Sequence, residues 1–397
     1  MQLAYDHLIQ QVKDYDPSRY HGTRNYTNGA VTAWSPYISR GLLSPVFIME
    51  TLKSKYSKQA WLGFMQQMAW REYFQRVWQA KGNMILQDLK TPQTNQVLPH
   101  SPNAIISAAT GITAIDKAIH QLYEQGYLHN HLRMYISMLH ANIFKAAWLP
   151  GAKWMYAHLL DHDPAANFLS WQWVAGTSSS KQYVANQENI NKYTGTNQRH
   201  TFLDTAYENL PTALFDANGQ LRSTYKQDWI EPVDPITALQ KFDSFDSIIR
   251  SIKFASFDVN KINTNLPYCI YNSFNIDPLW HKKEQINRIL LLEPNHFEIF
   301  PVTQNVMQFI IDLAFENIND LQIFVGNFEA LKSQLNKLHT DKHEAGVELT
   351  KVLYYKEHPT TLHYEGIQEN RDWLFPEVSG YFPSFFGYWK KCEKLLK

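Results

Sequence analysis

Cysteine is scarce in this sequence. Two of the 397 residues are cysteines, Cys269 and Cys392. Two are too few for a disulfide framework, for a cysteine-held zinc ion or for an iron–sulfur cluster, and their scarcity suits a reducing compartment. We therefore expect a cytoplasmic protein with two inert thiols and no metal site.

The sequence has no excess of positive or negative charge, and it has no long apolar run. Lysine plus arginine and aspartate plus glutamate each number 37, so the net charge is zero. The total charge neither supports nor excludes nucleic-acid binding, because a local basic groove can exist within a neutral total. The first 16 residues carry charges throughout, unlike a signal peptide, and no uncharged apolar run reaches membrane-spanning length. The sequence thus predicts no association with a membrane.

Aromatic residues are abundant instead. They make up 14% of the chain, with 12 tryptophans and 22 tyrosines. Packing in a large helical core is the default explanation of any single tryptophan. Only the positions of these residues in motifs can give them a further role.

The first half of the chain has the apolar spacing of helices. In residues 58–78 and 129–149, large apolar residues recur three and four positions apart. Ser35 and Ser44 each precede a proline, which predicts two helices with a capping hydroxyl at their start. Both helix N-termini could accept an anion.

The second half has a different pattern. Residues 205–260 are rich in proline, aspartate and asparagine and read as a connection. Beyond them, short apolar runs alternate with a helical pattern, which predicts a parallel α/β sheet. The runs are residues 267–274, 287–294, 321–327, 350–355 and 360–366, with the helical pattern at 302–315. No glycine-rich phosphate fingerprint accompanies them, so a classical dinucleotide site in this half has little support.

The predicted fold is therefore a mainly α-helical domain followed by a smaller α/β domain. We place the helical domain at residues 1–225, a linker at 226–260 and the α/β domain at 261–397. The length of the chain is enough for two domains with a core each.

Polar side chains gather on one side of the helix expected around residue 133. Helical spacing puts the polar Asn130, Arg133 and Ser137 on one face, together with Met134. A buried arginine needs a carboxylate partner, and DHDPAANFLSWQWVAG offers Asp161 and Asp163. A structural ion pair explains one arginine and one aspartate, but here more polar groups converge than that explanation needs.

Five motifs resemble the flavin-binding core of the photolyase/cryptochrome family. In chain order they are AVTAWSPYISRGLLSP, AWREYF, TGITAIDKAIHQL, GYLHNHLRM and LLDHDPAANFLSWQW, within about residues 20 to 185. Five motifs in the family's order are far more specific than any one of them. The segment SSSKQYVANQENINKYTG departs from the common branches and suggests a divergent bacterial group.

The resemblance implies FAD, held in a U shape inside the helical domain. Its diphosphate would be bound by Thr32, Ser35 and Arg71 and closed off by Tyr20. Around the flavin ring, the implied cofactor-binding residues are Asn130, Arg133, Asp161, Asp163 and Asn167. Arg133 would pair with Asp161, Asp163 would accept hydrogen bonds from the FAD, and Asn167 would face the flavin's reactive nitrogen. The carboxylates would thus hold a cofactor.

Two tryptophans correspond to the family's electron-transfer chain. Trp171 matches the donor beside the flavin and Trp148 the next step, so we count both, with Asn167, as catalytic. The outer tryptophan of the usual triad should lie between residues 85 and 112, where the sequence has none. Photoreduction would then run through a tyrosine or through an alternative such as Trp154, or be slow.

The resemblance also implies a substrate-binding cavity. Two indoles, Trp70 and Trp173, would stack on a flipped-out pyrimidine dimer in single- or double-stranded DNA. The other implied substrate-binding residues are Gln67, Asn130, His131 and Met134. Asn130 and Met134 match the enzymes for cyclobutane dimers, whereas Gln67 and His131 replace a usual glutamate and arginine. DHDPAAN and WQWVAG are similar to the DASH branch, which favours single strands.

Domain order departs from the family. Ordinary members begin with an α/β antenna domain, whereas this chain opens on the FAD domain and ends with a half that loosely resembles that antenna domain. The identity of any second chromophore stays open.

Three functions are compatible with these residues. The first is a light-driven DNA-repair lyase, in which excited, reduced FAD gives an electron to a cyclobutane dimer. The second is a cryptochrome-type blue-light photoreceptor without repair activity. The third, a descendant without flavin, is disfavoured by the joint presence of Arg133, Asp161, Asp163 and Asn167.

Overall fold

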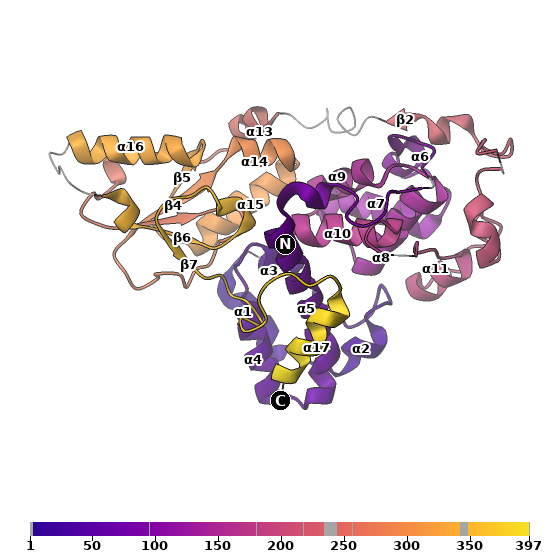
Figure 1. Ribbon diagram of the computed structural model, residues 1–397, viewed down its shortest axis with the longest axis horizontal. Coiled ribbons are helices and arrows are strands. Elements are labelled where there is room, and N and C mark those ends of the chain that lie inside the picture. The colour runs from indigo at the N-terminus through magenta and orange to yellow at the C-terminus, as the bar shows by residue number, and fades with distance from the viewer. Residues whose placement is uncertain are drawn as a thin grey trace.

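The computed structural model has a helical region followed by a parallel α/β region, as the sequence predicts (Figure 1). It describes residues 3–94, 96–179, 181–216, 218–233, 244–255, 257–341 and 348–396. Within these ranges, no helix has both the length and the apolar character needed to span a bilayer.

The helical region is built around the long helix α5. Its helices are α1 (Tyr5–Asp14), α2 (Tyr20–Thr23), α3 (Ser35–Ser39), α4 (Pro45–Lys55), α5 (Lys58–Lys81), α6 (Asn103–Ile106), α7 (Thr113–Gln125), α8 (Asn130–Met138), α9 (Trp148–His158), α10 (Pro164–Ala175) and α11 (Gln187–Thr194). A π-helical turn, Leu139–Ile143, continues α8. The two-residue strands β1 (Ser101–Pro102) and β2 (Pro232–Val233) pair antiparallel.

One of the two predicted helix caps is present and the other is wrong. Ser44 caps α4, since its hydroxyl accepts a hydrogen bond from the Phe47 amide. Ser35 is instead the first residue of α3, after Trp34, and makes no capping bond. The chain turns into α3 earlier than expected because Ala33 takes a left-handed conformation with φ of 53°. The anion site predicted from a Ser35 cap therefore loses that support.

The connection between the two regions contains little regular secondary structure. It contains the 3₁₀ turns Tyr207–Thr212 and Gln227–Ile230 and then helix α13 (Phe245–Ser251). Residues 234–243 and 256 of the predicted linker lie outside the described residues. The domain limits at 225, 226 and 260 stay a prediction.

The α/β region is a five-stranded parallel sheet. Its strands are β3 (Tyr268–Tyr271), β4 (Asn287–Leu292), β5 (Leu321–Val325), β6 (Leu353–Lys356) and β7 (Ile367–Glu369), in the order β5-β4-β3-β6-β7. The helices are α14 (Pro294–Ile299), α15 (Gln304–Asn317) and α16 (Phe328–Asp341). Ile270 and Ile289 pack beneath α16, whereas their neighbours Cys269 and Leu290 join the core shared with the helical region. The central strands β3 and β4 are buried almost throughout, because both faces of the sheet are covered there.

The last predicted strand is misplaced. Residues 360–366 were expected to be extended, but Pro359–Thr361 forms a 3₁₀ turn and β7 follows at Ile367. The reason is local, since the side chains of His358 and Thr361 cap this turn reciprocally and bend the chain away from the sheet.

The C-terminal helix α17 (Phe385–Leu395) returns to the helical region and packs along α5 (Figure 1). The N-terminus contacts the α/β region. The Asn317 side chain on α15 accepts a hydrogen bond from the Tyr5 amide and donates one to the Leu3 carbonyl. Each end of the chain thus contacts the opposite half.

Candidate functional site

A cavity of about 690 Å³ opens between α2, α3, α5, α8, α10 and α11. Its volume is typical of a site for a large organic ligand. It is lined by thirteen of the residues that the sequence motifs single out: Tyr20, Thr32, Ser35, Gln67, Trp70, Arg71, Asn130, His131, Arg133, Met134, Asp161, Asp163 and Trp173. Residues from four distant motifs therefore meet in one place.

One ion pair in the cavity is the predicted one. Arg133 Nη2 lies 2.8 Å from Asp161 Oδ2, and the guanidinium also donates to the Leu128 carbonyl at 3.1 Å. Both side chains are mostly buried. Because a buried charge without a partner is costly, removing either side chain would leave the other unpaired at the cavity wall.

Asp163 has two different oxygens. Its Oδ1 caps α10 by accepting from the Ala166 amide at 3.1 Å, and it also accepts from Gln75 Nε2 at 2.6 Å. Its Oδ2 is buried without a hydrogen bond and lies 3.3 Å from Arg71 Nη2. A buried acceptor of this kind fits a ligand that supplies a donor, which is the role expected of Asp163 toward FAD.

The loop that holds both carboxylates is fixed from behind by Arg40. This fully buried guanidinium donates to the carbonyls of Asp161 at 2.7 Å and Ser273 at 2.6 Å and contacts His162 Nε2 at 2.6 Å. Burial lowers its pKa to about 10, so it stays charged at neutral pH. Arg40 therefore joins the cavity loop to the segment after strand β3.

The mouth of the cavity has aromatic walls. Trp70 on α5 lies near Phe74, with ring centroids 5.5 Å apart, and Trp173 on α10 is 39% exposed. Tyr183 lies 5.7 Å from the Trp173 ring at an angle of 32°. The two indoles predicted to contact substrate thus both reach the cavity surface, one on each helix.

The histidines at the start of α8 are neutral at physiological pH. Burial lowers the pKa of His129 to about 4, with the nearby charges of His131 and Arg133 adding to the effect. Burial also lowers the pKa of His131, whose ring contacts the Asn25 carbonyl at 2.7 Å. The positive charges that line the cavity at neutral pH are therefore carried by arginines and not by these histidines.

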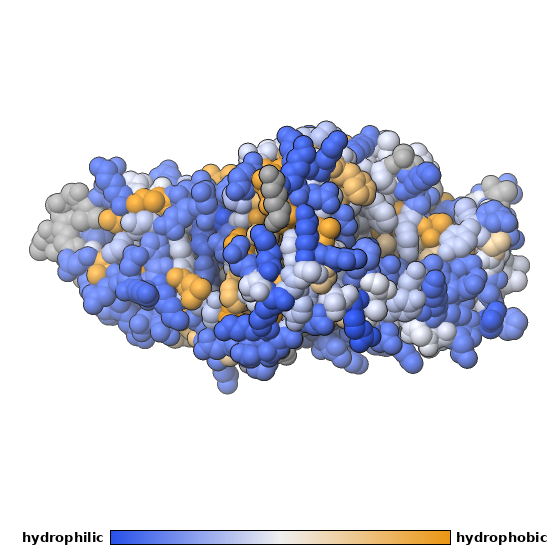
Figure 2. All heavy atoms as spheres, turned by 90° about the horizontal axis from the view of Figure 1, so that it is seen from below, coloured by the Kyte–Doolittle hydropathy of each residue, from blue (hydrophilic) through white to orange (hydrophobic). Residues whose placement is uncertain are grey.

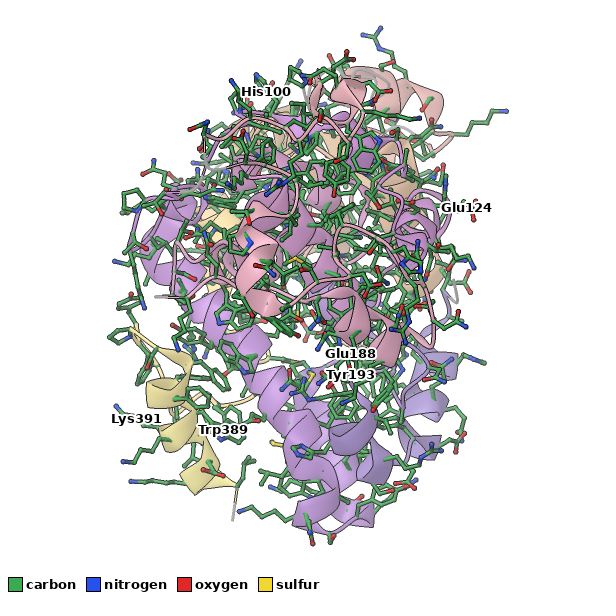
Figure 3. The ribbon with its side chains drawn as sticks, turned by 90° about the vertical axis from the view of Figure 1, so that its right-hand side faces the viewer. His100, Glu124, Glu188, Tyr193, Trp389 and Lys391 are labelled. Atoms are coloured by element: carbon green, nitrogen blue, oxygen red, sulfur yellow. The ribbon has the colours of Figure 1, made fainter. Side chains whose placement is uncertain are left out.

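Helix α11 supplies lining residues that the motifs did not reveal. Asn189 and Tyr193 come from the segment that departs from the family pattern (Figure 3 labels Tyr193 and Glu188 on this helix). Asn189 Oδ1 accepts from the Tyr135 hydroxyl at 2.8 Å, which fixes the orientation of the amide. The signal available in the sequence was the run of polar and aromatic residues in QENINKY.

Three of the predicted site residues do not line the cavity: Asn167, Trp148 and Trp171. Asn167 is buried on α10 and donates to the Ala152 carbonyl at 2.9 Å. Trp171 lies in the interior against His140, and Trp148 donates from Nε1 to Asp88 at 2.6 Å. Asp88 lies in the segment where the outer tryptophan is missing, so a carboxylate contacts the indole there.

The same part of the chain matches a known family. Residues 64–203 match the FAD binding domain of DNA photolyase. This region is therefore similar to the FAD-binding domain of the photolyase/cryptochrome family. FAD is accordingly the cofactor that this domain implies.

Curated relatives in the photolyase/cryptochrome family are distant. The deoxyribodipyrimidine photo-lyase of Halobacterium salinarum is 26% identical over 42% of this chain and 37% of its own length. The chloroplastic/mitochondrial cryptochrome DASH of Oryza sativa subsp. japonica is 30% identical over 40% of this chain and 29% of its own. A solved Synechocystis cryptochrome has a TM-score of 0.43 at 22% identity, covering 49% of this chain and 44% of that chain. The matches thus span less than half the length of each of these relatives.

Proposed function

We propose that this protein repairs cyclobutane pyrimidine dimers in DNA, with FAD held in the cavity between α5, α8 and α10. The observation that carries the proposal is the meeting of two features in one cavity. The paired charges Arg133–Asp161 and Arg71–Asp163 lie on its inner wall, and two indoles lie at its surface. The first feature suits a polar cofactor and the second suits unstacked bases.

On the cofactor side, the residues bind and orient. Arg71 provides a positive charge for a diphosphate, and the Oδ2 atom of Asp163 accepts from a donor on the ligand. Arg133 and Asp161 would place one positive and one negative side chain beside the flavin ring. Arg40 holds the loop behind them by a hydrogen bond to the Asp161 carbonyl. The bound FAD supplies, when reduced and excited by light, an electron for the lesion. Asn167 is not one of the residues that line the cavity, so its expected contact with the flavin stays a prediction.

On the substrate side, aromatic surfaces favour a damaged base pair. A dimer is poorly stacked, so flipping it out of the helix costs only a few kcal/mol. Stacking on Trp70 and Trp173, at about 1–3 kcal/mol per base, offsets much of that cost. The amides of Gln67 and Asn130 supply hydrogen-bond donors for pyrimidine carbonyls.

The test uses two neighbouring glutamines of α5. The purified protein, loaded with FAD and chemically reduced, is incubated with dimer-containing DNA under blue light and in the dark. We expect light-dependent restoration of the pyrimidines. Gln67→Ala should weaken dimer binding about fivefold through the loss of one hydrogen bond. Gln66→Ala, one residue away and outside the cavity lining, should not.

Two results would count against the proposal. If the reduced wild-type protein reverses no dimers in single- or double-stranded DNA, the repair function is wrong. If its flavin nevertheless changes redox state under light, the cryptochrome-type photoreceptor becomes the better function. If Gln67→Ala and Gln66→Ala weaken dimer binding equally, the cavity is not where the dimer binds.

A further inference from the structure

The C-terminal helix α17 forms part of the wall around Trp70. The Phe385 ring stacks on the Trp70 indole, with centroids 3.7 Å apart and an angle of 11° between the planes. Phe385 does not line the cavity, whereas Trp70 does. One face of the indole is therefore covered by α17, and α17 supports Trp70 from outside the cavity.

A buried carboxylate fixes α17 in this position. Glu72, two residues after Trp70 on α5, accepts from the amides of Leu374 and Phe375 and from the Tyr388 hydroxyl. The Phe375 and Tyr388 bonds measure 3.0 and 2.7 Å. Since Glu72 and Tyr388 are buried, the helix is anchored beside the cavity mouth by its inner side.

The outer side of α17 combines an exposed ring with lysines. Phe386 is 69% exposed and touches Trp70 edge-on, with centroids 6.4 Å apart. Lys390 and Lys394 follow it at helical spacings of four, and Lys391 is exposed beside them. Figure 3 shows Lys391 pointing away from α5 and Trp389 pointing toward it. From Phe386 to Lys394 this face is about 12 Å long.

We propose that this face of α17 binds the single strand that runs on from the lesion in the cavity. The proposal rests on the proposed function and extends it to a second contact surface. Lysines that follow an exposed ring are the combination that binds phosphates and stacks a base. The described part of α17 has one acidic residue, Glu393, beside these three lysines, so the charge is complementary to a nucleic acid. Seen from below, hydrophilic residues cover most of the molecule, and apolar residues gather near its middle (Figure 2).

The experiment measures binding in the dark, so that it does not depend on catalysis. The full-length, FAD-loaded protein is titrated with a labelled oligothymidine strand that carries one cyclobutane dimer, over a range of salt concentrations. The first variant replaces Lys390, Lys391 and Lys394 with glutamine. Three lost phosphate contacts should reduce the slope of log affinity against log salt by about 2 and the affinity at least about tenfold at low salt.

A matched control changes the same amount of charge elsewhere. Replacing the exposed Lys282, Lys283 and Lys337 of the α/β region with glutamine should leave the salt slope unchanged. Phe386→Ala should weaken binding about fivefold or more, whereas Leu362→Ala, which removes a side chain that is 70% exposed, should not.

The outcomes separate the two proposals. If both α17 variants bind like wild type while Gln67→Ala binds more weakly, the strand does not follow α17 and the cavity function stands. If both lysine triples weaken binding equally, the effect is one of total charge and the inference is wrong. If wild type reverses no dimers under light but the α17 variants still lose binding to the strand, the repair function fails and the surface remains a nucleic-acid site.

Discussion

Gly151 occupies a position where the interior leaves no room for a methyl group. A Cβ at this residue of α9 would lie 2.6 Å from Trp171 Cη2 and 2.7 Å from His140 Nε2. The glycine thus sets how closely α9 approaches the indole that we expect to donate electrons. Helix propensity alone would favour alanine here by about 1 kcal/mol, so only packing explains a glycine.

We predict that Gly151→Ala destabilises the protein by about 1–3 kcal/mol, because the buried ring and imidazole have to shift. Chemical unfolding measures the loss, and the rate of flavin photoreduction by an external reductant should fall if Trp171 moves. Gly22→Ala is the control, since nothing lies within 4 Å of a Cβ there. A neutral Gly151→Ala would show that α9 and α10 are not tightly packed.

The sequence allows some single-residue contacts to be predicted and hides others. The pairing of Arg133 with Asp161 follows from charge and burial, because a buried arginine has few possible partners. The bonds of Arg40 could not be predicted, since three of its acceptors are backbone carbonyls, one of them 233 residues away. Every residue has a backbone carbonyl, so the amino-acid sequence does not show which one will accept a hydrogen bond.

Helix α5 connects the cavity to the C-terminal segment. One side of it carries Gln67, Trp70 and Arg71 at the cavity, and another side carries Glu72 and Arg76. Arg76 lies over the Trp373 ring, 3.6 Å from its centroid. The spacing of apolar residues indicates that this helix exists. However, α5 is buried on several faces, and its apolar residues do not lie on one side of the helix. Which polar residue contacts which neighbour therefore depends on the tertiary fold.

We predict that Glu72→Ala releases the C-terminal segment. Three buried donors would lose their acceptor, at about 1–3 kcal/mol each, so residues 374–396 should exchange amide hydrogens much faster than in wild type. Glu50→Ala, which removes an exposed carboxylate from α4, should leave the exchange unchanged. If the segment stays protected in Glu72→Ala, the packing of Phe385 and Trp389 alone suffices to hold α17.

Across the whole molecule, the fold class could be predicted but not the arrangement. Periodicity indicates helices first and a parallel sheet second, because each pattern is local. The contact between the sheet and the cavity loop could not be predicted, since it rests on residues from both halves: the buried Arg40, His162 and His358 and the half-buried Phe274. The return of α17 to α5 is likewise a long-range contact without a local signal.

Buried neutral histidines make the stability of this structure depend on pH. Burial lowers the pKa of His140 to about 3 and that of His162 and His358 well below the usual 6.5, with the charge of Arg40 adding to the latter two. In the unfolded chain these groups titrate near 6.5. Between 6.5 and the folded values, the unfolded state therefore binds protons that the folded state does not.

Stability is fully present above about pH 6.5 and is lost as the pH falls below it, by up to about 1.4 kcal/mol per histidine and pH unit. We predict that chemical unfolding at pH 7 and pH 5 will differ by several kcal/mol. Replacing His140 with glutamine should reduce that difference by about 2 kcal/mol, because one buried titrating group is removed. Replacing His100, which is exposed (Figure 3), should not change it. A free energy of unfolding that is flat from pH 7 to pH 5 would mean that these imidazoles accept protons without opening the core.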